Sequence, residues 1–314
     1  MANSTLLNTH EFINETNLSP RHLAWNRFLH HKGAVVSFII IICFFILSFS
    51  APIFEYFFDI NANAVNLFDR FQPSTSKHLF GTDELGRDVF SRLLYGGQIS
   101  LLVGLITALV AALIGTFVGL ISGYYGGRVD QILMRFTDSI IALPLLPLLI
   151  ILAAVDLNKL GLPETITHSE YLSLYRIIFI IALFGWTTVA RLVRAKTLSV
   201  KQQDYIKAAY SLGVHPKHII FRHVLPNVIG PIIVATSLSI GNIILLESVL
   251  SFLGLGIQPP VASWGNMLTN AQDLIWDQPL LTFYPGIMIF VVVISFNFLG
   301  DGLQDALNPK TLKK

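Results

Sequence analysis

The chain has 314 residues, of which 53% are hydrophobic and 13% are charged, and its formal net charge is +2. Soluble globular domains carry about 25% charged residues, so this composition excludes that class and favours a polytopic membrane protein. The small net charge indicates no nucleic-acid partner, and the single cysteine, Cys43, excludes an internal disulfide.

The first part of the chain, residues 1–33, is predicted to be a cytoplasmic tail that ends in an amphipathic helix. Trp25, Phe28 and Leu29 follow Pro20 beside basic residues, a pattern typical of a helix lying on the membrane surface. An unstructured basic leader is the alternative. Residues 34–98 are predicted to hold the first membrane span and an extracytoplasmic loop, with a short helix at 86–95.

Six apolar segments predict an all-α polytopic membrane protein, since each is long enough, or nearly so, to cross about 30 Å of hydrocarbon. Pro144, Pro147 and Pro231 lie within spans and predict kinks rather than breaks, because neighbouring helices can satisfy the freed carbonyls. The fourth span is short, and residues 172–174 are expected to lengthen it across Arg176. The predicted spans are 34–54, 99–122, 132–155, 177–193, 228–250 and 283–303.

The placement of lysine and arginine predicts the orientation of these spans. Basic residues concentrate in the N-terminal tail, between the fourth and fifth spans, and in the C-terminal tail. Because cytoplasmic segments carry the excess of lysine and arginine, both termini are predicted to be cytoplasmic. Residues 99–303 then form a core with five spans and a cytoplasmic loop at 194–226, and residues 304–314 form a cytoplasmic tail.

The loop between the fourth and fifth spans is predicted to contain a short helix with a flat apolar face. Tyr205, Ala208, Ala209 and Leu212 fall on one side of this helix, and the two alanines make the middle of that side smooth. Such a face fits a groove on another protein. It fits equally well against helix ends of the same chain.

The boundaries of this loop follow from glycine and proline. Gly213 suits the left-handed residue that ends a helix. Pro216 suits the first position of a second helix, where its missing N–H costs nothing. Leu225-Pro226 is expected to close the unit just before the next apolar run.

The spacing of these residues resembles a known family loop. Membrane subunits of binding-protein-dependent ABC importers share a cytoplasmic loop with the pattern Glu-Ala-Ala, three residues, Gly, nine residues, Ile, one residue and Leu-Pro. Ala208-Ala209, Gly213 and Leu225-Pro226 keep this spacing. The chain departs from the pattern at two positions, with Lys207 in place of Glu and His223 in place of Ile.

Further segments indicate a branch of that family. Residues 80–97, 123–144, 247–265 and 299–309 resemble the second of the two permease subunits in the dipeptide, oligopeptide and nickel branch. The RHxLPN form at 222–227 is also common there. The resemblance runs from Trp25 to the C-terminus, and residues 156–171 lie outside its motifs.

The resemblance implies the type I ABC importer permease fold in a bacterial inner (cytoplasmic) membrane, surrounded by the lipid bilayer. The expected partners are a homologous second permease subunit, two ATPase subunits and an extracytoplasmic solute-binding protein. The chain has no GxxxxGK[ST] phosphate loop, so ATP and Mg are expected on the ATPase subunits. The chain itself is predicted to be a transport subunit without a cofactor or enzymatic activity, and without a metal site.

The expected role is to form half of the translocation pore of an importer for di- or oligopeptides; nickel or a metal chelate is the alternative solute. By the resemblance, the helix that starts at Asp204 is the coupling helix, which seats in a groove of an ATPase subunit. The residues expected to couple to the ATPase are Asp204, Tyr205, Lys207, Ala208, Ala209, Leu212, Gly213, Arg222, Leu225 and Pro226.

Three features outside the loop leave alternatives open. Glu247 lies in an apolar run, and it either faces the translocation path, holds two helices together, or reaches water at the outer interface. His215 and His218 are interpreted as surface histidines rather than metal ligands. Pro259-Pro260 and Trp264 are expected on the outer side, in the aromatic belt, in a gate, or in a docking surface for the binding protein.

Two other classes of function fit the sequence less well than an importer subunit. An autonomous secondary transporter or channel needs charged or polar residues in several spans, and beyond Glu247 and Arg176 these are scarce. An intramembrane enzyme needs a convergent set of catalytic groups in the bilayer, and no HExxH motif is present.

Overall fold

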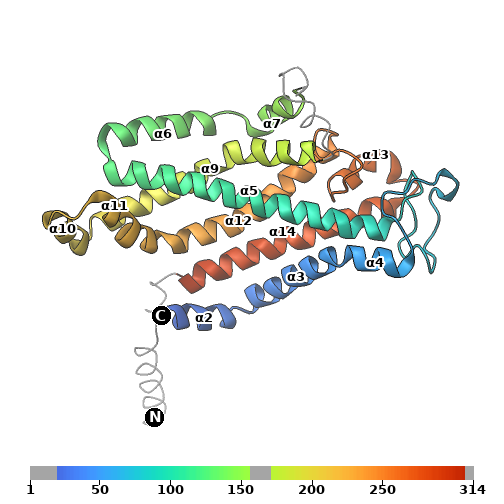
Figure 1. Ribbon diagram of the computed structural model, residues 1–314, viewed down its shortest axis with the longest axis horizontal. Helices are drawn as coiled ribbons and strands as arrows, with labels where there is room; N and C mark the ends of the chain where they lie inside the picture. Colours follow the sequence, from blue (N-terminus) through green and yellow to red (C-terminus); the bar gives the residue numbers. More distant parts are fainter. Residues whose placement is uncertain (1–19, 156–170, 308–314) are drawn as a thin grey trace, which may run out of the picture.

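The computed structural model describes residues 20–155 and 171–307, and within these ranges the chain is helical and contains no strand. Five helices there are long and apolar enough to cross a membrane, or six if the bent pair α6–α7 counts as one span. They run side by side along the long axis of the molecule (Figure 1). The five are α3 (Lys32–Phe49), α5 (Val89–Tyr125), α9 (Leu172–Lys201), the rod Pro216–Phe252 and α14 (Pro279–Leu307). The tail residues 1–19 and 308–314, and the segment 156–170, lie outside the described residues.

Helices α5 and α9 pack closely because α5 presents three glycines spaced four residues apart, Gly115, Gly119 and Gly123. A Cβ on Gly115 would lie 2.5 Å from the carbonyl oxygen of Trp186, and one on Gly119 would lie 2.6 Å from that of Ala190. Gly123 meets α9 in the same way one turn later. Small residues with this spacing let two helix backbones approach each other inside a membrane, where packing rather than the hydrophobic effect drives association.

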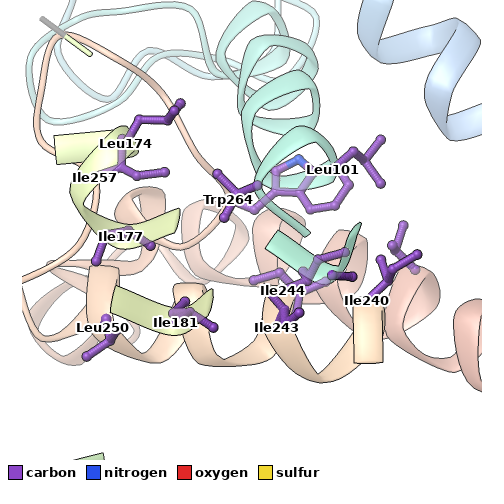
Figure 2. Packing of buried hydrophobic residues seen from close by; sticks show 14 of the residues in the cluster. Leu101, Leu174, Ile177, Ile181, Ile240, Ile243, Ile244, Leu250, Ile257 and Trp264 are labelled. Atoms are coloured by element: carbon purple, nitrogen blue, oxygen red, sulfur yellow. The ribbon is translucent and has the colours of Figure 1, made fainter. Parts of the chain in front are cut away.

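The main apolar core lies where α5, α9, α12 (Leu225–Phe252) and α14 meet (Figure 2). Leu101 of α5, Ile177 of α9 and Ile244 of α12 are all fully buried there. Trp264, which follows α12 in the chain, is buried in the same cluster. Helix α3 packs on α14 at the side of the bundle, where Gly302 of α14 and Ala34 meet.

Two of the observed helices extend beyond the apolar runs that predicted them, and the first span is shorter than predicted. The expected separate helix at 86–95 and the expected span at 99–122 are one helix, α5, which starts at Val89 with Asp88 as its N-cap. Helix α9 starts at Leu172 and passes through Arg176, as expected, and it continues to Lys201. The first span ends earlier than expected, since α3 stops at Phe49 and α4 (Ala51–Phe58) follows.

The prediction of a kinked but continuous third span was wrong. Helices α6 (Gly127–Ile141) and α7 (Leu145–Ala153) are separate and bent by 80° at the break between them. Pro144 has no N–H to continue the helix, and it disfavours helical geometry at Leu143. Pro231, by contrast, lies inside the continuous helix α12.

Helix α2 (Pro20–His30) forms as expected, and one side of it docks on the bundle. Phe28 is buried with Ala34 and Ala306, whereas Trp25 and Leu29 are exposed. α2 and the last turn of α14 therefore lie together. Gly230, near the start of α12, approaches Leu307, so this pair also lies toward the end of the bundle that carries α10 (Asp204–Ser211) (Figure 1).

We call this the α10 end, and the opposite one, with α13 (Ala271–Leu274) and the loop at 59–88, the α13 end (Figure 1). The loop at 59–88 is held by its own polar groups. Asp83 accepts from the backbone N–H groups of Leu85 and Arg87, both at 2.9 Å, and Arg87 Nε donates to its second oxygen at 2.7 Å. The loop at 59–88 therefore holds a fixed conformation through its own hydrogen bonds.

Candidate functional site

Helix α10 projects from the bundle and exposes most of its surface. Tyr205 is 48% exposed and Leu212, at the C-cap, is 83% exposed, with Ala208 exposed between them. Ala209 is half-buried and packs inward. The predicted face of four residues is therefore divided: Tyr205, Ala208 and Leu212 form the outer face, which we call the α10 face, and Ala209 supports it.

A small apolar cluster fixes α10 to the rest of the molecule. Ile206 is buried against the cluster that contains Val200 at the end of α9, with Ile219 and Val224 from the following helix. This cluster is separate from the main core around Trp264. Ile206 was not among the predicted site residues; it falls on the side of α10 opposite Ala208, which is the signal that could have identified it.

The predicted boundaries on either side of the loop are partly confirmed. Gly213 has φ +74° directly after α10, in the left-handed region that glycine adopts at low cost. Pro216 starts helix α11 (Pro216–Ile219). Residues 194–201 of the predicted loop, however, are helical and belong to α9.

The prediction that Leu225-Pro226 closes the unit was wrong. Helix α11, the π-helical turn η3 (Ile220–Val224) and α12 follow one another without a break, and Leu225 N–H donates to the carbonyl of Ile220. Pro226 cannot donate to the carbonyl of Arg222, and its ring would clash with that carbonyl in a regular α-helix. The wider π turn makes room for it. The loop therefore leads directly into a membrane-spanning rod.

Polar residues surround the α10 face. Lys207 Nζ and Asp204 Oδ1 are 3.2 Å apart, and both side chains are exposed. The Tyr205 hydroxyl accepts from Asn227 Nδ2 at 3.3 Å, and the ring centroids of Tyr205 and His223 are 6.5 Å apart. Arg222 and Pro226 are exposed and Leu225 is half-buried in the same region. The sequence pattern missed Tyr210, which is largely exposed on α10 but lies off the predicted face.

Ion pairs and a hydrogen bond connect α5, α6 and α9 near the point where the chain enters α10. Arg194 of α9 donates to both oxygens of Asp130 in α6, at 2.5 and 2.6 Å. Arg191 Nη2 donates to Asp138 Oδ1 at 2.5 Å. Lys201, the last residue of α9, donates to the carbonyl of Tyr124 at the end of α5. α5, α6 and α9 are thus tied together where α10 leaves the bundle.

Glu247 is fully buried in α12, and serine hydroxyls surround its carboxylate. Ser251 Oγ donates to Oε1 at 2.7 Å and Ser263 Oγ donates to it at 2.9 Å. Ser100 of α5 lies 3.4 Å from Oε2, and Ser248 Oγ lies 3.5 Å from the same oxygen. The carboxylate thus joins α12 to α5 and to the segment after α12, which matches the helix-packing alternative. With 0% exposure, it does not reach water at an interface.

Trp264 is also buried, which contradicts its expected place in an aromatic belt. It is 1% exposed, and its indole N–H donates to the carbonyl of Leu93 at 2.9 Å. Its backbone N–H donates to Ser100 Oγ, which links it to the Glu247 network. Figure 2 shows its indole against α5, beside Leu101. Trp264 is a packing residue, and Trp276, which follows α13, is the strongly exposed tryptophan at this end.

No metal site is found in the residues that the structure describes, since no three His, Cys, Asp or Glu side chains converge there. His215 Nδ1 accepts from the backbone N–H of Lys217, and His31 Nδ1 accepts from that of Ala34. These two histidines therefore cap helices.

Comparisons with known proteins cover nearly the whole chain. Residues 115–313 match the model of the family described as binding-protein-dependent transport system inner membrane component. Residues 19–73 match the N-terminal TM domain of oligopeptide transport permease C. A solved structure titled as an amino acid ABC transporter with histidines aligns with a TM-score of 0.46 at 20% identity, over 69% of this chain and 92% of that chain, which is too distant to support an argument.

Curated relatives align over almost their full lengths. An oligopeptide transport system permease protein from Bacillus subtilis is 37% identical over 96% of this chain and 94% of its own. A dipeptide transport system permease protein from Alkalihalophilus pseudofirmus is 38% identical, with 94% and 91% covered. A glutathione transport system permease protein from Pectobacterium atrosepticum is 39% identical, with 91% and 90% covered.

Proposed function

The chain belongs to the family of binding-protein-dependent transport system inner membrane components, and on that premise we propose that it forms half of the translocation pore of an ATP-driven peptide importer. It is a multi-pass inner-membrane protein and a transport subunit. The other half of the pore would come from a homologous second permease. Two ATPase subunits, which carry ATP and Mg, and an extracytoplasmic solute-binding protein would complete the assembly.

The α10 face is the observation that carries this proposal. Tyr205, Ala208 and Leu212 form a small apolar surface that no part of the described chain covers. An exposed apolar surface with polar neighbours is typical of a protein–protein contact. The concentration of lysine and arginine near this end supports its placement in the cytoplasm, with the α13 end outside. The α10 face is therefore assigned to a groove on an ATPase subunit.

The continuous rod that follows α10 provides a route from the ATPase to the membrane. Ile206 packs against Ile219 and Val224, so α10 and the start of the rod move together. Because helix Pro216–Phe252 has no break, a displacement of α10 reaches the membrane interior as a rigid-body movement. ATP-driven closure of the ATPase pair would then switch the pore between inward-facing and outward-facing states.

Di- or oligopeptides are the proposed solutes, because the relatives that match over nine-tenths of the chain include oligopeptide and dipeptide permeases. A nickel or metal-chelate importer of the same branch is the alternative. In either case the binding protein would select the solute.

A bulky residue on the α10 face tests the coupling role. Ala208→Trp should abolish peptide uptake by proteoliposomes that contain the full assembly, and it should release the ATPase subunit during co-purification, because overfilling a fitted contact typically costs about 1–3 kcal/mol. Ala154→Trp, at an exposed alanine after α7, is the matched control and should leave both measurements unchanged.

Ala208 is preferred to two nearby positions. Ala209 is half-buried and Gly213 has a positive φ, so a tryptophan at either would disturb folding as well as docking. Peptide uptake that persists when no ATPase subunit is present would refute the proposal.

A further inference from the structure

Helix α6 lies between two breaks in the backbone (Figure 1). Before it, Gly126 and Gly127 have φ of +68° and +54°, and a Cβ on either glycine would meet no atom within 4 Å. After it, the chain bends by 80° across residues 142–144 before α7 begins. Hinges are short segments at the ends of elements that absorb large changes in φ and ψ. α6 therefore has a segment suited to a hinge at each end.

The bundle covers little of α6. Met134 and Thr137 are its buried residues, whereas Ile132 and Phe136 are exposed. The ring of Phe136 stacks on that of Trp186 in α9, with the centroids 6.3 Å apart. α5 and α9, in contrast, are joined by three close glycine contacts. Because elements with few buried contacts open at a low free energy, α6 is the part of this helix group that separates most easily.

Two ion pairs hold α6 against α9. Arg194 donates to both carboxylate oxygens of Asp130, and Arg191 donates to Asp138. Ser122 of α5 also donates to Asp130. The side chains of Arg191 and Asp138 are about half exposed. Ion pairs near the surface contribute little free energy each, so they can break and re-form within a working cycle.

The two arginines lie on the part of α9 that leads to α10. α9 ends at Lys201, and two residues separate it from the start of α10. Val200, near the end of α9, packs in one apolar cluster with Ile206 of α10. A displacement of α10 therefore shifts this end of α9 against α6, where the ion pairs lie.

We propose that α6 is a hinged arm, that the pairs Asp130–Arg194 and Asp138–Arg191 are the latch that holds it against α9, and that the arm leaves α9 when α10 is displaced. The structure holds the arm in its latched state. The inference rests on the proposed function, which supplies the ATPase subunits that displace α10. It adds an ion-pair switch within this subunit, at named residues.

The test measures the distance between spin labels on α6 and α9 by pulsed electron–electron double resonance, in the complete assembly in nanodiscs with cysteine-free partner subunits. The labels are placed at Ile132→Cys and Ser199→Cys, which are exposed and outside the latch, and Cys43→Ser removes the exposed native cysteine. Without nucleotide, the wild-type latch should give one main distance. ATP with an inhibitor of hydrolysis should add a second, longer distance, because closure of the ATPase pair displaces α10.

A charge swap isolates the latch at its more exposed pair, where substitution leaves the fold intact. Arg191→Asp places two acids opposite each other, and it should raise the ratio of released to latched arm by about fivefold without nucleotide. Adding Asp138→Arg restores the pair with reversed signs and should return the ratio to the wild-type value. Arg135→Gln removes an exposed charge of α6 outside the latch; it is the control and should leave the ratio unchanged.

The outcomes separate the arm, the latch and the proposed function. One distance that stays the same with ATP and in Arg191→Asp would overturn the hinged arm. Release by ATP with an unchanged ratio in Arg191→Asp would overturn the latch. Failure of the wild-type chain to co-purify with any ATPase subunit would instead overturn the proposed function. The ratio in Arg191→Asp would still test the latch in that case, because this comparison needs no nucleotide.

Discussion

The two ends of the bundle differ in how many of their key side chains are buried. At the α13 end, Glu247, Trp264 and Arg92 are buried polar or aromatic groups, and the first two are held by hydrogen bonds to separate segments. At the α10 end, Tyr205 and Leu212 are exposed and one buried residue, Ile206, anchors the short helix. Substitutions of these buried residues at the α13 end should therefore lower the free energy of unfolding. Substitutions of the exposed residues at the α10 end should instead weaken the binding of a partner.

The largest loss of stability is expected at Trp264. Trp264→Ala should lower the free energy of unfolding by about 3–5 kcal/mol, because it leaves a cavity in the core and frees the carbonyl of Leu93. SDS titration in mixed micelles measures the change. Trp276→Ala, at the exposed tryptophan of the same end, should change it by less than about 0.5 kcal/mol. Similar losses in both variants would break the comparison.

The next largest effect is expected at Glu247. Glu247→Ala should cost roughly 2–4 kcal/mol in the same titration, because the hydroxyls of Ser251 and Ser263 lose their acceptor inside the core. Glu247→Gln keeps one acceptor oxygen and should cost about half as much. If Glu247→Ala left stability intact but abolished transport, the carboxylate would belong to the translocation path instead.

A smaller effect is expected at the ion pair between α6 and α9. Arg194→Met should cost about 1 kcal/mol, since the pair with Asp130 is bidentate and partly buried. The matched change Lys207→Met removes the exposed partner of Asp204 and should cost less than about 0.5 kcal/mol. A larger loss from Lys207→Met would mean that α10 is stabilised more strongly than its exposure indicates.

The smallest effect on stability is expected on the α10 face. Leu212→Ala should change the free energy of unfolding by less than about 0.5 kcal/mol, because the side chain is 83% exposed. Peptide uptake should nevertheless fall, by about tenfold, if the leucine fills a pocket on the ATPase subunit. Ser211→Ala, at the neighbouring exposed position, is the control. If Leu212→Ala lowered the free energy of unfolding but left peptide uptake unchanged, this prediction would be wrong.

The local features of the chain were predictable from its sequence. Runs of apolar residues located the helices that could cross a membrane, apart from the break between α6 and α7, because a spanning helix needs about 20 predominantly apolar residues. Gly213 and Pro216 marked the end of one helix and the start of the next, because each restricts its own backbone. The family motifs pointed to the permease branch, to which the comparisons with known proteins also point.

Features that depend on distant residues were decided only by the tertiary structure. Ala209 shares a helical side with Ala208, yet it packs inward because Ile206 docks α10 on the following rod. Glu247 is buried because hydroxyls from Ser100 and Ser263, far apart in the sequence, converge on its carboxylate. Sequence periodicity assigns a residue to one side of its own helix, but which side is covered depends on the segments that pack against it.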